Sequence, residues 1–559
     1  MSATGKTLGG AGKTVDDRFG GGKWGITVMR KAFPDHWSFL LGEIAMYSFV
    51  VLLFTGIFLT FFFKPGMTEV VYQGGYTKLN GVHMSEAYAS TLRISFDVRG
   101  GLLVRQIHHW SAVLFIGAIL LHMLRHFFTG SYRKPREISW LIGMVLMILA
   151  FAEGFAGYSL PDDLLSGTGL RIFAGVVAGI PIVGSYLLTF IFGSEFPGED
   201  FISRLYIVHV LLIPGLLAAL IPLHAIVLTW RLKHTQFPGH RRAERNVVGY
   251  PFFPVFIAKT TAFLLAVTGV TTLLASIAQI NPVWLFGPYD PSAITAGAQP
   301  DWYLGFLEGA LRIMPPAELT MFGYTLSLSV AIPALIVPGV LFGGLAIYPF
   351  VEKWFLSDYR YHHTLDRPRN APLRTGLGAA GIAFYGVLWA AGGNDVIAVT
   401  LGVDLFGTTW FFRVAVLVGP VLAYIVAYRI CIGLQRRDRE LASHGIEIGQ
   451  ITMSPDGQFR EASRPLREIE RAVVFSKKPM PQLKVDESDG NGVAAPEQRR
   501  PLTRVVTKLR VRLNEAYHNG RVPLPDGHGN GDRPLAGQVA SGAARRPNGE
   551  LNAPDDPDY

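Results

Sequence analysis

Cysteine is almost absent from this chain of 559 residues, which contains one, Cys431. A single thiol cannot close an intrachain disulfide or hold an iron–sulfur cluster, so we expect neither. Charged side chains are also scarce, at 17% of the residues. The first 35 residues are polar and glycine-rich, and they lack the apolar core of a cleavable signal peptide. No nucleic-acid-binding module is recognisable, so the formal net charge of +9 needs another explanation.

Long apolar runs are what the chain has in abundance. Half of its residues are hydrophobic, and most of these gather into segments long enough to cross a bilayer as helices. We therefore expect an all-α integral membrane protein with eight transmembrane helices, the first four forming a bundle. The expected spans are 39–63, 102–128, 138–160, 205–230, 255–280, 321–350, 375–391 and 410–434. A further segment, 172–192, contains Gly179, Pro181 and Gly184, and we expect it to form interfacial helices on the outer side.

Basic residues cluster after the second, fourth and sixth spans. They are Arg133, Lys134, Arg136, Arg231, Lys233, Arg241, Arg242, Arg245, Lys353, Arg360, Arg367, Arg369 and Arg374. Such loops stay in the cytoplasm, which places both termini inside and accounts for the positive net charge. The expected parts are a polar extension (1–37), two four-helix membrane domains (38–245 and 246–435) and a polar, partly disordered cytoplasmic extension (436–559). This last part contains an amphipathic piece, 502–517, and a tail, 527–559, suited to solvent or to docking another subunit.

Two histidine pairs share nearly the same spacing. His108 and His122 lie 14 residues apart in the second span, and His209 and His224 lie 15 apart in the fourth. Steps of this size return a side chain to about the same helix face, ~21 Å along the axis. Because these spans run parallel, His108 pairs with His209 near the outer face and His122 with His224 near the inner face. A lone membrane histidine is often only a packed, hydrogen-bonded residue, but four in register favour axial ligation of two haem irons. His109 points ~100° away from His108, which makes it the less favoured ligand without excluding it.

Glycines and arginines fit the same interpretation. Gly42 and Gly56 in the first span, and Gly143 and Gly157 in the third, repeat the 14-residue step. A missing side chain lets a flat macrocycle approach the helix, although close helix packing explains any one glycine equally well. The candidate partners for haem propionates are Arg105, Arg125 and Arg204. Their alternative role is anchoring at the membrane interface.

With these motifs the chain resembles cytochrome b, the membrane core of the cytochrome bc complexes. The resemblance covers roughly residues 37–435 and rests on Arg105-Gln-Ile-His108 through His122-Met-Leu-Arg125, the glycines, Gly157-Tyr158-Ser-Leu-Pro161, Arg204 through His209 and His224, and Pro300-Asp301-Trp302-Tyr303. The 15-residue histidine step and the loop at 134–137 are similar to the chloroplast type, but that type is split and carries a cysteine where this chain has Leu40. One unsplit chain with polar extensions looks like the subunit of an actinobacterial respiratory bc complex.

The resemblance implies a bacterial cell-membrane subunit with two non-covalent haem b groups, the outer iron held by His108 and His209 and the inner by His122 and His224. Quinol, in that group menaquinol, is oxidised near the outer face; one electron goes to a Rieske iron–sulfur partner and the other through both haems to an inner quinone site, in a proton-translocating Q cycle. It also implies a c-type cytochrome subunit with two haems, a homodimer, and a supercomplex with a cytochrome oxidase.

The outer quinol site is expected around Asp301, where the family places the carboxylate that accepts a proton. A helix N-cap is a second, compatible role for Asp301. Glu308 lies two turns further and can relay the proton from an apolar pocket, or can simply pair with Arg312 at i,i+4. The other expected lining residues are Tyr158, with a catalytic role, Pro161, Gly169, Leu170, Pro300 and Tyr303.

The inner quinone site has fewer markers. Lys259 matches the family's lysine, but Thr260 replaces the acidic residue that often follows it. His36 and Glu43 remain open as proton donors. Glu153 lies inside the third span, and an ionisable residue within a membrane is expected to have a function. The sequence assigns it no partner.

Three other classes of protein compete with this interpretation. A dihaem anchor of a dehydrogenase has fewer spans and lacks the Pro-Asp-Trp-Tyr segment. A haem–copper oxidase needs three more clustered histidines in the membrane, whereas His362 and His363 lie in a basic loop. A transporter with broken helices finds support in the interruption at 179–184.

Overall fold

The computed structural model describes residues 27–193, 198–229, 231–293, 299–476, 480, 482–483, 501–519 and 521–524. Within these residues, seven helices are long and apolar enough to cross a membrane, or eight if one bent pair counts as a single span. The bent pair joins α15 (Pro372–Ala391) to α16 (Asn394–Leu401) at 64°. The expected helical membrane fold with eight spans is therefore confirmed.

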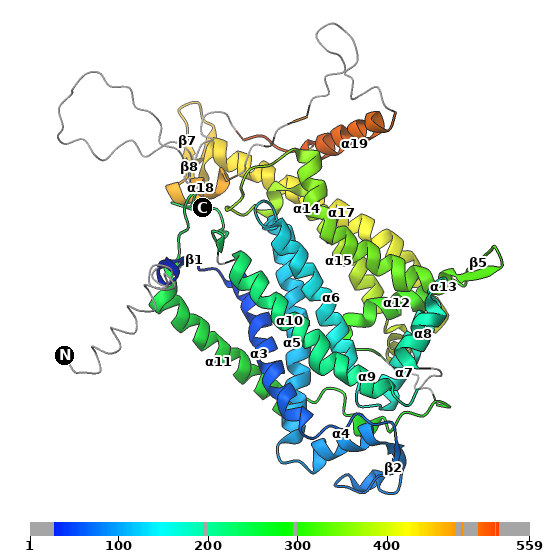
Figure 1. Cartoon of the computed structure of the whole chain (residues 1–559). Coiled ribbons are helices and arrows are strands. Elements are labelled where there is room, and N and C mark those ends of the chain that lie inside the picture. Colours follow the sequence, from blue (N-terminus) through cyan, green and yellow to red (C-terminus); the bar gives the residue numbers. More distant parts are fainter. Residues whose placement is uncertain are drawn as a thin grey trace, which may run out of the picture.

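The first four spans form one bundle in Figure 1. They are α3 (Leu40–Thr60), α5 (Gly101–Thr129), α6 (Glu137–Ser159) and a composite fourth span made of α9 (Phe201–Ile207), η3 (Val208–Leu212), α10 (Ile213–Pro222) and η4 (Leu223–Thr229). The stretches η3 and η4 are π-helical and lie next to Pro214 and Pro222. Proline removes a backbone donor from the helix, so the hydrogen-bonding pattern shifts beside it.

The second half packs beside this bundle. Its fifth span joins η5 (Phe252–Phe256) to α11 (Ile257–Ile277), and its sixth joins α13 (Leu328–Ala331), η8 (Ile332–Ile336), η9 (Gly339–Gly343) and α14 (Gly344–Leu356). The seventh is α15, and the last is α17 (Leu405–His444), which continues ten residues beyond the predicted end at 434. The predicted end comes too early, because the helix continues as a charged helix beyond its apolar segment.

Short elements close the two ends of the bundle, here called the α4 end and the α19 end (Figure 1). The α4 end carries η2 (Thr77–Leu79), α4 (Glu86–Phe96), α7 (Leu164–Ala178), α8 (Gly184–Phe192), η6 (Val283–Leu285), η7 (Trp302–Leu304) and α12 (Gly305–Ile313). Neither α7 nor α8 is long enough to span a membrane, because the chain breaks between them at 179–183. This agrees with the expectation that segment 172–192 does not cross.

Strands occur only as antiparallel pairs in the described residues. They are β1 (Ala32–Phe33) with β4 (Tyr250–Pro251), β2 (Glu69–Val71) with β3 (His83–Ser85), β5 (Glu318–Met321) with β6 (Tyr324–Ser327), and β7 (Ile446–Met453) with β8 (Phe459–Arg464). Two short 3₁₀ helices, η1 (Trp37–Phe39) and η10 (Pro368–Asn370), precede α3 and α15.

The C-terminal extension is more ordered than predicted. Beyond α17 the chain forms the β7–β8 hairpin, α18 (Glu468–Val474) and α19 (Pro501–His518), and α19 confirms the amphipathic piece expected at 502–517. Helix α19 packs on the end of α14: Arg510 Nε donates to the Trp354 carbonyl over 2.8 Å, and Asn514 Nδ2 to the Phe355 carbonyl over 3.1 Å. The expected tail, 527–559, and most of the N-terminal extension lie outside the described residues.

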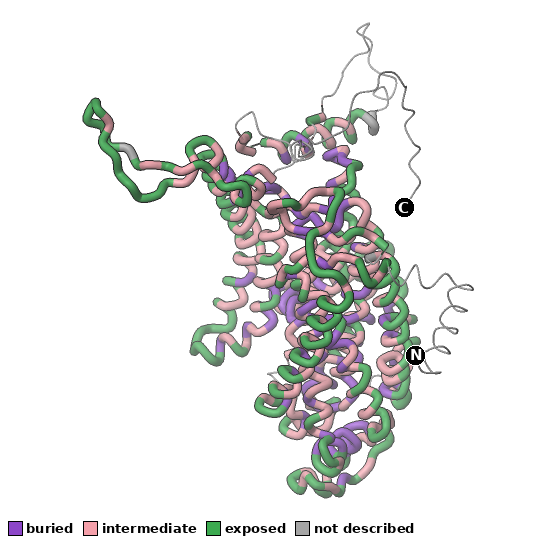
Figure 2. The backbone as a smooth tube through the Cα atoms, turned by 90° about the vertical axis from the view of Figure 1, so that its left-hand side faces the viewer, coloured by how far each residue is buried: buried purple, intermediate pink, exposed green. Residues whose placement is uncertain are grey.

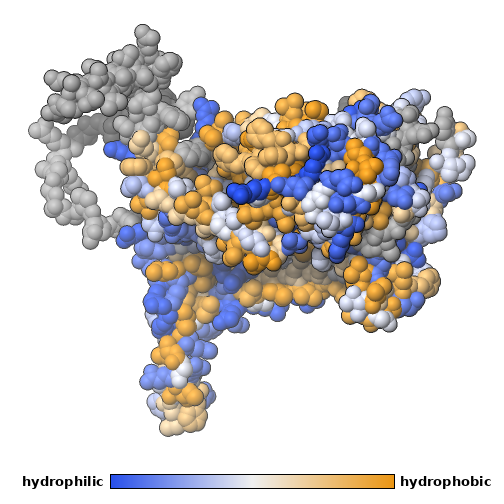
Figure 3. All heavy atoms as spheres, turned by 90° about the horizontal axis from the view of Figure 1, so that it is seen from below, coloured by the Kyte–Doolittle hydropathy of each residue, from blue (hydrophilic) through white to orange (hydrophobic). Residues whose placement is uncertain are grey.

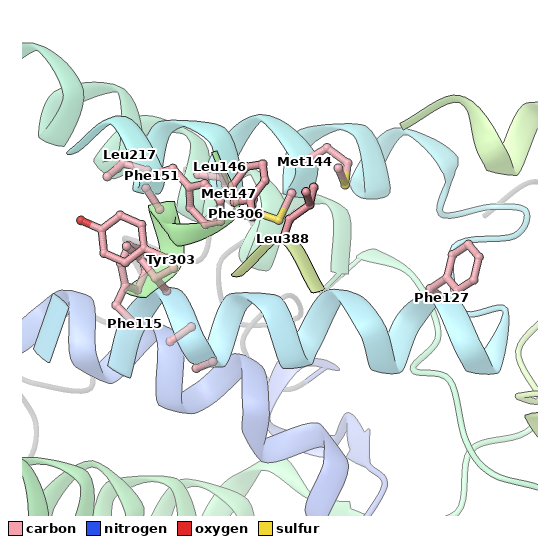
Figure 4. Close-up of a cluster of buried hydrophobic side chains, with 14 of the residues drawn as sticks. Phe115, Phe127, Met144, Leu146, Met147, Phe151, Leu217, Tyr303, Phe306 and Leu388 are labelled. Carbon is pink, nitrogen blue, oxygen red and sulfur yellow. The ribbon is translucent and has the colours of Figure 1, made fainter. Parts of the chain in front are cut away.

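The main core lies between the two halves of the membrane part. Phe115 and Phe151 of the first four spans meet Tyr303 and Phe306 of η7 and α12 there (Figure 4). In Figure 2, stretches of buried backbone lie inside the bundle. The outside of the spans is apolar as well: the exposed fractions of Phe54 and Leu417 are 72% and 74%. Seen from the α4 end, Figure 3 shows hydrophilic residues among hydrophobic ones. Apolar flanks with mixed ends suit a protein surrounded by lipid.

A buried charge cluster ties three segments together near the α19 end. Asp366 forms ion pairs with Arg133 Nη2 at 2.6 Å and with Arg374 Nη2 at 2.8 Å, and Arg374 Nη1 pairs with Glu352 at 3.3 Å. Tyr132 donates to the other Glu352 oxygen over 2.7 Å. Two arginines and two carboxylates balance one another, as buried charges must.

Candidate cofactor and substrate sites

The histidine pair at the α4 end comes together in the structure. His108 of α5 and His209 of η3 face each other with ring centroids 6.2 Å apart and planes at 77°. Two imidazoles on opposite sides of one metal ion, each bonded at about 2 Å, have ring centres separated by about 6 Å. The spacing of these two rings therefore fits a single metal ion between them.

Thr55 of α3 sets which nitrogen of His108 carries the proton. The Thr55 hydroxyl donates to the Val51 carbonyl over 2.7 Å, and its oxygen lies 2.9 Å from His108 Nδ1. Since the hydroxyl proton is already used, Nδ1 of His108 must donate to Thr55. The neutral ring then keeps its lone pair on Nε2, the form that a metal ion needs.

Each of the four glycines predicted to flank a cofactor lies against one of the four histidines. A Cβ on Gly157 would lie 2.5 Å from His209 Cε1, and one on Gly42 would lie 2.9 Å from His122 Cε1. The same measurement gives 3.3 Å both for Gly56 with His108 and for Gly143 with His224. A side chain at these positions would displace the imidazoles, so the glycines belong to the histidine sites and are not general packing positions.

The pair toward the α19 end has different surroundings. His122 Nδ1 is buried without a hydrogen-bond partner in the part of the chain that the structure describes, and Ser139 Oγ lies 3.4 Å from His224 Nδ1. Arg125, one turn from His122, stacks over Phe39 at 4.3 Å. Its Nε and Nη2 are also buried without partners among the described residues. Unpaired guanidinium nitrogens next to a histidine pair fit an anionic group such as a haem propionate.

The other two arginines differ. Arg105 donates through Nη2 to the Asn281 carbonyl over 3.3 Å, and its buried Nε has no partner in the described residues, so it stays available to an anion. Arg204 is half-exposed and bonds Asp200 and the Phe190 carbonyl. The structure does not bring Arg204 to the histidines, because a closer carboxylate one turn earlier on its own helix holds it.

Asp301 sits beside a histidine that the sequence left in second place. His109 Nε2 lies 3.2 Å from both carboxylate oxygens of Asp301, whose side chain is 10% exposed. The fully buried Tyr303 places its hydroxyl 3.4 Å from the same carboxylate. Asp301 occupies the N-cap position of η7, but its side chain makes no capping bond. The carboxylate is therefore directed to His109 and Tyr303 and does not stabilise its own helix.

Glu308 is buried, and it is also paired. Arg312 donates from Nε to Glu308 over 2.8 Å and reaches Asp395 with Nη1 at 2.8 Å. The second carboxylate oxygen of Glu308 is buried without a partner among the described residues. Burial raises the pKa of Glu308, and the charge of Arg312 acts in the opposite direction. Both alternatives posed by the sequence are thus present: a buried carboxylate and an i,i+4 ion pair.

Of the remaining candidate lining residues, Tyr158 contacts the segment before Asp301, whereas Leu170 packs in a separate apolar cluster with Leu160 and Phe192. Tyr158 donates to the Gln299 carbonyl over 3.4 Å, next to Pro300, and its ring would meet a Cβ on Gly169 at 3.8 Å. Leu170, on the same helix as Gly169, is buried. The segment that includes Pro161 ends in two buried aspartates, and burial raises the pKa of one of them, Asp162, to about 6.

A polar group at the other end of α3 surrounds the candidate inner site. Lys259 forms an ion pair with Asp35 at 2.8 Å, and both side chains are about half exposed. Thr260 donates to Glu43 over 2.8 Å, and Tyr47 bonds both of them. Position 260 has lost its carboxylate, but α3 supplies Glu43 to the same place. His36 instead bonds Ser38 and packs against Phe237, with ring centroids 4.2 Å apart and planes tilted by 38°.

Sequence reasoning missed two contacts. Glu153 Oε1 of α6 lies 3.0 Å from His209 Nδ1, although the two residues are 56 positions apart in the chain. The contact of His109 with Asp301 spans 192 positions. An ionisable residue in an apolar span is the signal that pointed to Glu153; nothing in the sequence named its partner.

Comparisons with known proteins agree with this geometry. A family model described as "Cytochrome b(N-terminal)/b6/petB" matches residues 113–288. A protein of Streptomyces coelicolor named "Cytochrome bc1 complex cytochrome b subunit" is 49% identical over 521 residues, which cover 92% of this chain and 94% of that protein. Proteins of the same name from Corynebacterium diphtheriae and Mycobacterium tuberculosis are 50% and 51% identical, covering 82% and 79% of this chain and 84% and 80% of their own lengths. A solved chain titled "Hyperthermophilic respiratory Complex III" shares the fold with a TM-score of 0.55 at 20% identity, covering 74% of this chain and 99% of that chain.

Proposed function

Because this chain belongs to the family of cytochrome b subunits of cytochrome bc1 complexes, we propose that it is the dihaem subunit of a respiratory menaquinol–cytochrome c oxidoreductase. The dihaem assignment rests on one observation: each of the four histidines lies against one of the four glycines. His108 and His209 hold the outer haem iron, and His122 and His224 hold the inner one. When bound, each haem supplies a one-electron centre, because its iron alternates between Fe(III) and Fe(II).

The side chains at the α4 end prepare the oxidation of quinol. Asp301 accepts a hydroxyl proton of quinol, and His109 and Tyr303 orient its carboxylate. Glu308 takes up a proton in the same pocket, with Arg312 holding it toward Asp395. Tyr158, which donates to the Gln299 carbonyl next to Pro300, lines the same site. Haems held by the two histidine pairs would carry one electron toward a quinone near Lys259 and Glu43, and a Rieske iron–sulfur partner would take the other.

We propose for this chain the setting expected of its family, with an orientation taken from the charged loops. The complex contains a Rieske subunit and a c-type cytochrome subunit with two haems, forms a homodimer, and joins a cytochrome oxidase in a supercomplex. It lies in the bacterial cell membrane with both termini in the cytoplasm. The α4 end is then the outer end, and quinol oxidation releases protons there in a Q cycle.

Haem analysis of the purified complex tests the assignment. We expect a reduced-minus-oxidised spectrum with two b-type haems for each copy of this chain, released by acidic acetone because they are not covalently attached. A dehydrogenase anchor could show the same haems but would lack quinol–cytochrome c activity. Absence of b-type haem would contradict the proposal and would favour a transporter.

The proton acceptors are tested by amide substitutions. Asp301→Asn is expected to slow quinol oxidation by about 100-fold to 10,000-fold, the usual contribution of a positioned base, with both haems retained. Glu308→Gln is expected to slow it less and to change its pH dependence. The matched control is Glu318→Gln, which alters an exposed carboxylate of β5. Unchanged turnover of Glu308→Gln across the pH range would contradict the relay.

A further inference from the structure

Glu153 is a carboxylate inside a membrane span, and the proposed proton chemistry does not use it. It lies on α6, four residues before Gly157, and its side chain is 18% exposed. Its Oε1 is 3.0 Å from His209 Nδ1, an ion-pair distance, and that Nδ1 makes no hydrogen bond among the described residues. Its second oxygen, Oε2, is buried without a partner among the described residues. The histidine is thus the contact that accounts for an otherwise costly group in the membrane.

Three of the four histidines have a polar side chain facing Nδ1, whereas Nδ1 of His122 has no partner among the described residues. His108 faces the hydroxyl of Thr55, and His224 faces the hydroxyl of Ser139. His209 faces a carboxylate. A carboxylate at ion-pair distance makes the imidazole a better electron donor to a metal ion than a hydroxyl does.

We propose that Glu153 is a positioning residue that fixes His209 for the outer haem and lowers the reduction potential of that haem relative to the inner one. This inference rests on the proposed dihaem function. Reduction adds one electron to the ferric centre while the proton stays on Nδ1 of His209. A negative charge next to the ligand stabilises the ferric state over the ferrous state. Arg125, beside the inner pair, carries the opposite charge. Electrons are therefore driven from the outer position to the inner one.

The test is a redox titration of the whole complex, followed optically so that the two haems are resolved. Glu153→Gln keeps the shape and an acceptor oxygen but removes the charge. We expect it to shift the equilibrium constant for electron sharing between the haems roughly tenfold toward the outer haem, a typical size for such a contact. For one electron that corresponds to about 59 mV. The low-spin ferric resonance of the outer haem should shift as well, because the ring of His209 is no longer held in the same way.

Two variants serve as controls. Glu318→Gln removes an exposed carboxylate of β5, and should leave both haem potentials unchanged. Glu153→Asp keeps the charge and should restore most of the original potential. If Glu153→Gln retains both haems at their original potentials, the inference is overturned while the dihaem function stands. If Glu153→Gln loses the outer haem, a normal potential in Glu153→Asp supports the inference, and loss there too overturns it. Absence of haem from the unsubstituted complex would instead refute the proposed function.

Discussion

The two histidine pairs sit on the same two spans at almost the same spacing, yet their surroundings are electrically opposite. The pair near the α4 end has Glu153 on His209 and the Asp301 carboxylate next to His109. The pair near the α19 end has the hydroxyl of Ser139 and the buried guanidinium of Arg125. The difference teaches that helix geometry alone would make the two sites equivalent, and that single charged side chains from neighbouring positions make them different.

Removing one ligand from each pair tests whether the sites are separate. His209→Leu is expected to abolish the outer haem and quinol oxidation, because leucine offers no lone pair to the iron. His224→Leu should abolish the inner haem and leave the outer one in place. Haem quantitation and low-temperature optical spectra would measure both. If either variant lost both haems, the two sites would be one cooperative unit and the comparison would fail.

Substitutions of the glycines should have smaller effects on haem retention than those of the histidines. Gly157→Ala places a methyl group 2.5 Å from His209, whereas Gly143→Ala places it 3.3 Å from His224. Overpacking of this kind costs about 1–3 kcal/mol, so the outer site should lose haem at a lower temperature in Gly157→Ala. Gly143→Ala should show a weaker effect on the inner haem. The retention of each haem during heating provides the measurement, and equal losses would contradict the order of distances.

The smallest effect is expected at Arg125. Arg125→Gln removes a positive charge near the inner pair and should lower the potential of the inner haem. The equilibrium constant for electron sharing between the haems should change only a few-fold, because charges near the membrane boundary are partly screened. Glu153→Gln and Arg125→Gln should then both narrow the gap between the two haems. A redox titration in which Arg125→Gln raised the inner potential would show that Arg125 acts by another route.

Much of this arrangement was predictable from sequence because helices in lipid must satisfy their own backbone and repeat with a fixed period. The spans, the pairing of His108 with His209, and the glycine at each histidine follow from that period and from the charged loops. The actinobacterial type of cytochrome b also followed from motifs, and the relatives confirm it.

What the period cannot specify is which side chain meets which across different helices. Glu153 was flagged without a partner, and His109 was placed second, because both contacts depend on the packing of helices that are distant in sequence. Arg204 was assigned to a propionate, but a local carboxylate, Asp200, holds it. The C-terminal extension was expected to be partly disordered with an amphipathic piece at 502–517, and α19 forms there; its packing against α14 is what no local pattern reveals.

The charge cluster of Arg133, Glu352, Asp366 and Arg374 limits how this family can vary. Neutralising one member leaves an opposite charge buried and unbalanced, at a cost of about 3–5 kcal/mol. A lineage can therefore exchange these residues only in compensating pairs, one arginine together with one carboxylate. In an alignment of relatives, an arginine of this cluster should therefore change only together with one of its carboxylates, even though members of the cluster are up to 241 residues apart in the chain.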